Sequence, residues 1–171
     1  MQKAAVYRYA RIILCAVYLT AAALIQCSVF PHIRLLGVIP DIALCAVAAV
    51  VCFEEPRVSC VFAVYTGFLL DVTGGAPYMI SPVLFLLAAV ISLAIRDRLP
   101  SMRLLSASAA ALFCTLINCA VCAAILASKG AGLYETALHT ALPELLYTAI
   151  VFIPVYLLSK LHYTIFKNEK N

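Results

Sequence analysis

The chain has 171 residues, of which 65% are hydrophobic and 12% are charged, and its mean hydropathy is +1.06. Soluble domains are only about half apolar, so this composition excludes an ordinary soluble domain and predicts a membrane protein. The net charge of +4 is less informative than the positions of Lys and Arg, because those positions set the orientation of a membrane protein.

Apolar stretches without charged residues follow one another along the chain, and each is a candidate transmembrane helix. A helix needs about 20 mostly apolar residues to cross the hydrocarbon core of a bilayer. The first stretch is too long for the apolar part of a cleavable signal peptide, so we expect it to stay as an anchor. The third is the shortest, and it is either a tilted span or a segment that does not fully cross. The six stretches are residues 12–30, 35–53, 58–72, 78–95, 104–126 and 142–158.

The basic residues favour six crossings with both termini in the cytoplasm. With that topology, ten of the twelve Lys and Arg residues fall on the inner side, where basic residues are enriched. Only Arg34 and Lys129 fall outside. If the third stretch did not cross, the basic C-terminal tail would lie on the outer side. We therefore expect one domain over residues 1–171, an all-α bundle of six transmembrane helices whose connections are too short to form a catalytic domain.

The eight cysteines all lie in apolar stretches or at their edges, where cysteine behaves as a small hydrophobic residue. Cys119 and Cys122 form a CxxC pair, but no second pair or nearby His accompanies it. We expect neither a disulfide framework nor a metal site.

Acidic residues at the membrane edge are candidate functional residues, because burying a carboxylate in a membrane is costly. Asp41 follows Pro40 at the start of the second helix, Asp71 lies at the end of the third, and Glu144 follows Pro143 at the start of the sixth. With six crossings, all three carboxylates lie toward the outer face and could share one polar site.

Each of these acids also has a structural interpretation. Asp41 and Glu144 lie in first helical turns, where a carboxylate complements the positive end of the helix dipole. Asp71 lies at a helix C-terminus, where that explanation is weaker, and it precedes Gly74 and Gly75, which permit a tight turn. For Asp71 we favour a structural or docking role. The natural counter-ion on the outer side is Arg34.

Small residues recur at every fourth position of the fifth stretch and allow close helix approach in lipid. They serve either packing within the chain or an interface with a partner helix. Asn118 in this stretch and Gln26 in the first stretch could each supply an interhelical hydrogen bond. One stripe is Ser106, Ala110, Cys114, Asn118 and Cys122, and beside it run Ala107, Ala111, Thr115, Cys119 and Ala123.

Catalytic motifs are missing from the sequence. It has no Gly-rich phosphate loop, no HExxH and no GxSxG, and its three histidines are scattered. We expect no enzymatic activity and no cofactor. The expected environment is the lipid bilayer, with protein partners and no nucleic acid.

Several short motifs resemble the rod shape-determining protein MreD family. They occur in the family's order and spacing over roughly residues 20 to 100. The chain departs from the family at Leu69 and Leu70, where members often have a Gly shortly before the Asp. The motifs are Leu24-Ile25-Gln26, Phe30-Pro31, Gly37-Val38-Ile39-Pro40-Asp41, Gly67-Phe68-Leu69-Leu70-Asp71 and Gly74-Gly75.

This resemblance implies a non-enzymatic subunit of the bacterial cell-elongation machinery in the cytoplasmic membrane. Its implied partners are MreC, RodA and a class B penicillin-binding protein, with MreB indirectly. It also implies a helical bundle similar to the substrate-binding membrane component of energy-coupling-factor transporters. Such a vitamin-binding component is the alternative function, supported by the helix count and the outward polar cluster.

Overall fold

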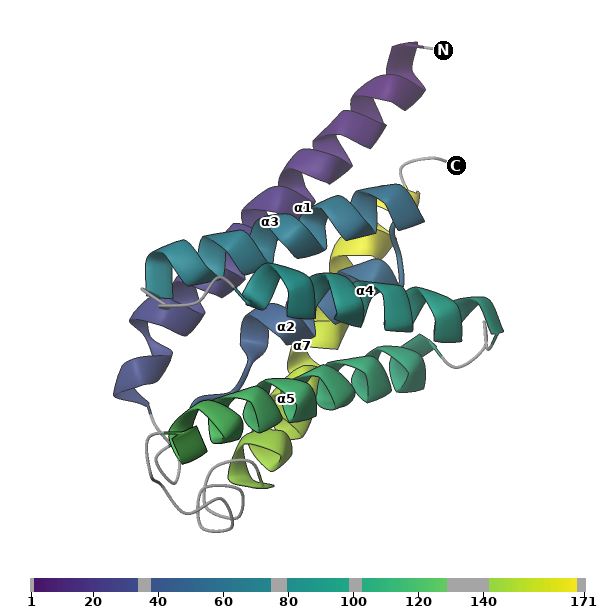
Figure 1. Ribbon diagram of the computed structural model, residues 1–171. Helices are drawn as coiled ribbons and strands as arrows, with labels where there is room; N and C mark the ends of the chain where they lie inside the picture. Colours follow the sequence, from purple (N-terminus) through teal and green to yellow (C-terminus); the bar gives the residue numbers. More distant parts are fainter. Residues whose placement is uncertain (1, 34–37, 75–79, 99–102, 129–141, 169–171) are drawn as a thin grey trace.

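The computed structural model describes residues 2–33, 38–74, 80–98, 103–128 and 142–168 (Figure 1). Within these ranges the chain forms six α-helices and one short 3-10 helix, which confirms the all-helical prediction for this part of the chain. The helices are α1 (Gln2–Ser28), η1 (Phe30–His32), α2 (Ile42–Val51), α3 (Pro56–Gly74), α4 (Ser81–Arg98), α5 (Arg103–Ser128) and α7 (Leu142–Asn168).

Four of the described helices are long and apolar enough to cross a membrane, which is the pattern of a multi-pass membrane protein. Their apolar windows are Tyr9–His32, Pro56–Gly74, Leu104–Val121 and Leu142–Leu161. The third helix, expected over residues 58–72, is longer at both ends and belongs to this group. Large apolar side chains cover the outside of the bundle, as lipid contact requires; they include Ile13, Val17, Val61, Phe68, Leu105, Phe113, Leu146, Ile150 and Leu157.

The second helix differs most from its prediction. The apolar stretch 35–53 predicts a full span, but α2 has only 10 residues. At 1.5 Å per residue such a helix is about 15 Å long, half of the roughly 30 Å core of a bilayer. Proline disfavours helical backbone in the residue before it, so Pro40 keeps Ile39 out of the helix and α2 begins only after Asp41.

Helix α2 lies at the centre of the bundle. Every one of its residues is buried, and it contacts each of the other described α-helices. Figure 1 shows it enclosed between α4 and α7. Non-helical backbone at membrane depth is tolerated where protein surrounds it, so a short central helix with a non-helical segment before it and a turn after it is compatible with a membrane. Hydropathy alone does not distinguish such an internal helix from a lipid-facing span.

The chain-terminal ends of α1 and α7 lie on the same side of the bundle, as Figure 1 shows. The guanidinium of Arg11, in the first half of α1, is 5.8 Å from the ring centroid of Tyr163 near the end of α7.

Helix α4 ends with Arg96, Asp97 and Arg98 and is not among the four long apolar helices.

Candidate functional site

A cavity of about 320 Å³ lies at one end of the bundle, and all six described α-helices contribute to its wall. It brings together six residues singled out in the sequence, which come from five different helices or their caps. These residues are Gln26, Asp41, Asp71, Gly74, Asn118 and Glu144. Apolar side chains form much of the remaining wall, including Ile39, Leu44, Leu70, Leu84 and Phe85.

Asp41 caps the N-terminus of α2 together with Gln26 from α1. The Asp41 Oδ1 atom accepts hydrogen bonds from the backbone N–H of Leu44 and from Nε2 of Gln26, both at 3.2 Å. The Oε1 atom of Gln26 accepts from the backbone N–H of Ala43 at 2.6 Å. Two side chains therefore satisfy two of the backbone donors that a helix start leaves without intrahelical partners.

The other contacts of this helix start explain how buried polar groups are accommodated there. The backbone N–H of Ile42 donates to the carbonyl of Pro40, whose side chain is fully buried. The backbone N–H of Asp41 donates to Oγ1 of Thr148 on α7 at 3.3 Å. Asp41 therefore acts at the start of its helix, as the structural interpretation has it, but as the N-cap and not as a first-turn residue. Its side chain also lines the cavity.

Asp71 caps a helix other than its own. Its Oδ2 atom accepts from the backbone N–H of Ser81, the first residue of α4, at 3.1 Å. The side chain is buried, with only 4% of the residue exposed, and its Oδ1 atom is a buried acceptor without a hydrogen-bond partner among the described residues.

Gly67 lies one helical turn before Asp71 and faces the same part of α4. A Cβ atom at Gly67 would lie 2.6 Å from the Cα and N atoms of Pro82, well inside van der Waals contact. At Gly74 a Cβ would meet only the Sγ atom of Cys27, at 3.6 Å. Gly67 and Asp71 therefore position the start of α4 together, one by allowing close approach and the other by a hydrogen bond.

Glu144 and Asn118 complete the polar part of the wall. Glu144 lies in the first turn of α7 and is partly buried, and Asn118 reaches the cavity from α5. Gly75, predicted to assist the turn after Asp71, and Arg34, the expected counter-ion, lie outside the described residues.

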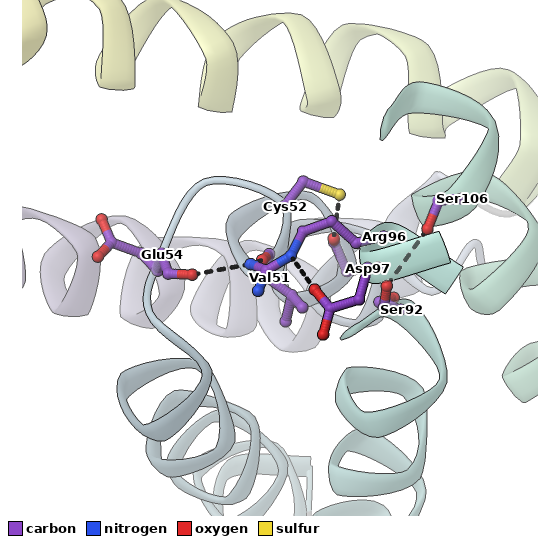
Figure 2. Close-up of polar contacts among 8 residues, drawn as sticks. Val51, Cys52, Glu54, Ser92, Arg96, Asp97 and Ser106 are labelled. Atoms are coloured by element: carbon purple, nitrogen blue, oxygen red, sulfur yellow. Dashed lines mark hydrogen bonds and ion pairs between the residues drawn. The ribbon is translucent and has the colours of Figure 1, made fainter. Parts of the chain in front are cut away.

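The small-residue stripes of α5 lie mostly inside the bundle. Ala107, Ala111 and Cys114 have at most 1% of their surface exposed, and α5 contacts α2, α4 and α7. Ser106 on the same helix donates to the backbone carbonyl of Ser92 on α4 at 3.3 Å (Figure 2). These contacts place the described part of the stripes against other helices of the same chain.

The opposite end of the bundle holds polar contacts that the sequence analysis did not anticipate. The Nη1 atom of Arg96 donates to the backbone carbonyls of Val51 and Glu54, at 2.9 and 3.0 Å, and so satisfies acceptors at the C-terminus of α2 (Figure 2). The Arg11 Nη2 atom donates to Oε2 of Glu54 at 2.9 Å, and the Glu54 side chain is only 3% exposed.

In the sequence, Arg11 and Arg96 were interpreted only as inner-side charges that set the orientation of the protein in the membrane. The available signal was their position at the edge of apolar stretches, where a charged side chain can reach back to a buried backbone group or acid. Sequence spacing did not predict the partners of the two arginines, because these partners lie in α2 and in the turn after it.

Comparison with protein-family models, with curated proteins and with solved structures found no match for this chain. Among the described residues, no group of three or more His, Cys, Asp or Glu side chains is arranged to hold a metal ion.

Proposed function

We propose that this chain is a non-enzymatic membrane scaffold subunit of the bacterial rod complex, which supports cell-shape maintenance and lateral peptidoglycan synthesis. The observation that carries the proposal is that four of the motif residues that resemble MreD position the starts of two helices beside one cavity. Gln26 and Asp41 cap α2, and Asp71 caps the start of α4; these three residues line the cavity. Gly67 allows the start of α4 to approach α3.

The surface of the bundle supports an assembly role. Helices α1 and α7 expose apolar side chains along much of their length, which suits contact with lipid or with the membrane segments of other proteins. The proposed partners are MreC, RodA and a class B penicillin-binding protein, with MreB linked indirectly.

The proposed topology has six crossings in the cytoplasmic membrane, with both termini in the cytoplasm. In addition to the four long apolar helices, α4 forms one crossing, and α2 with the non-helical segment before it and the turn after it forms another. The cavity then faces the outer side, where it is available to the membrane-proximal segment of MreC.

Co-purification with tagged MreC tests the scaffold role. We expect the wild-type chain to co-purify, and the double variant Asp41→Asn, Asp71→Asn to lose most of the association and to round rod-shaped cells. Asparagine is chosen because its amide oxygen still accepts the cap hydrogen bonds, so the variant removes charge with little effect on the helix starts.

Asp97→Asn is the matched control, since Asp97 is 70% exposed and lies at the opposite end of the bundle. If the double variant and this control both retained MreC and normal cell shape, the acids would have no docking role. Failure of the wild-type chain to associate with MreC would reject the scaffold proposal itself.

One observation favours a second candidate, the substrate-binding membrane component of a vitamin transporter. The cavity of about 320 Å³ falls at the small end of the range of ligand pockets and combines polar and apolar walls. Saturable binding of a vitamin by the purified protein, together with co-purification of an energising transporter module, would establish this function instead.

A further inference from the structure

We infer that the cavity binds an organic cation, with a primary ammonium group hydrogen-bonded to Asp71. This inference concerns the cavity already described but does not depend on MreC or on any other protein of the rod complex. Binding to the purified chain tests it, whereas co-purification and cell shape test the proposed function.

Asp71 is incompletely hydrogen-bonded in the described part of the chain. One carboxylate oxygen accepts from the start of α4, while the other, Oδ1, is buried and has no partner in the described part of the chain. Asp71 is also one of the residues that line the cavity. Buried polar atoms in native proteins are nearly always hydrogen-bonded, so an acceptor left open beside a cavity calls for a donor from the cavity.

The charged side chains of the described cavity wall are all acidic. The cavity wall contains Asp41, Asp71 and Glu144, and no Lys, Arg or His is among its described lining residues. Helices α2, α4 and α7 begin at this end while α1, α3 and α5 run toward it, so their opposed dipoles largely cancel. The acidic side chains are therefore the source of charge at the described wall, and a negative charge there favours a cation.

The apolar part of the cavity wall favours an organic cation. The three acids line one cavity, yet within the described residues no three ligating side chains are close enough to share a metal ion. An ammonium group offers three N–H donors and can sit on an alkyl chain. Leu44, Leu70 and Leu84 provide the apolar wall against which such a chain packs.

The same chemistry has two sources, a free small amine and the lysine side chain of a membrane segment. We therefore design two arms, both using the full chain in nanodiscs of phosphatidylcholine, with empty nanodiscs to subtract partitioning into lipid. The first arm measures binding of n-butylammonium against neutral 1-butanol by calorimetry. The second measures association of a membrane-spanning leucine–alanine peptide with one outer lysine, against its norleucine counterpart.

In at least one arm, we expect the ammonium-bearing probe to bind about tenfold or more tightly than its neutral partner, because charge-assisted hydrogen bonds are the stronger ones. Asp71→Asn keeps an acceptor for Ser81 and should lower the affinity about tenfold. Glu144→Gln should weaken binding in the same direction. The exposed control Asp97→Asn should leave affinity unchanged within about twofold.

The responding arm identifies the source of the ammonium group. Equal binding of charged and neutral probes in both arms would overturn the inference and leave the cavity as a water-filled space. Full affinity in Asp71→Asn would also overturn it. If Asp71→Asn does not fold, Glu144→Gln decides, and wild-type affinity in that variant rejects the site.

Discussion

Gly67 and Asp71 are one turn apart on α3, and both act on the first residues of α4. The glycine allows the backbone of Pro82 to approach, and the carboxylate receives the N–H of Ser81. This arrangement gives a physical reason for a Gly and an Asp four residues apart, since that spacing puts both on one face of a helix. Asp71 is thus at once the cap of a neighbouring helix and a wall of the cavity.

Gly67→Ala should destabilise the protein. The added Cβ would lie 2.6 Å from backbone atoms of Pro82 and 2.7 Å from the carbonyl carbon of Ser81, and backbone atoms do not move as easily as a flexible side chain. Overpacking of this kind lowers the free energy of unfolding by about 1 to 3 kcal/mol. Thermal unfolding of the purified protein in detergent measures the effect.

Gly74→Ala is the matched control for this prediction. Its Cβ would make an ordinary contact of 3.6 Å with Cys27, so the free energy of unfolding should change by less than about 0.5 kcal/mol. Equal unfolding temperatures for the two variants would show that the approach of α3 and α4 at Gly67 is not tight.

At the scale of the element, α2 is a short helix whose two ends are held by other helices. Gln26 and Asp41 supply acceptors at its N-terminus, and Arg96 supplies donors near its C-terminus. An anion at the N-terminus and a cation at the C-terminus both complement the helix dipole. A helix of 10 residues is marginal by itself, so its stability comes from these caps and from complete burial.

Arg96→Met should weaken the C-terminal end of α2. Methionine keeps an apolar stem of similar length but removes the donors to the carbonyls of Val51 and Glu54. Leaving such buried acceptors unsatisfied costs about 1 to 3 kcal/mol, and chemical unfolding in detergent would record the loss.

Arg98→Met makes the same chemical change at an exposed position two residues later and should leave stability nearly unchanged. If both arginine variants unfolded like the wild type, the contacts of Arg96 with α2 would not contribute to stability.

At the scale of the whole molecule, the cavity exists because α1, α3 and α5 run toward one end and α2, α4 and α7 start there. The polar residues of five helices or caps then meet, although they are far apart in the sequence. The other end gathers Arg11, Glu54 and Arg96. The bundle therefore has a predominantly acidic cavity at one end and a mixed ion-pair cluster at the other.

Topology reporters test the arrangement of these two ends. Fusion of a fluorescent protein after Asn171 should give signal in the cytoplasm, and alkaline phosphatase fused after Gly74 should be active outside, because α3 ends at the cavity side. Phosphatase activity after Asn171 would mean an odd number of crossings and would contradict the proposed topology.

The sequence alone predicted the features that depend on local composition. Long apolar stretches identified α1, α3, α5 and α7, because each is long enough and has few charges. Because an acidic side chain in a membrane is energetically costly, Asp41, Asp71 and Glu144 were identified as candidate functional residues. A Pro-Asp pair also placed the start of α2 near Asp41, although the helix was expected to begin earlier and to span.

Tertiary structure decided what depends on contacts between distant residues. A lipid-facing helix and a helix buried among others have the same hydropathy, so only packing showed that α2 is internal. Likewise, no spacing rule linked Asp71 to Ser81 or Arg96 to Val51, because hydrogen bonds between helices depend on how the helices are placed in space. Composition determined that this chain enters a membrane, and the packing of its helices determined where its charges meet.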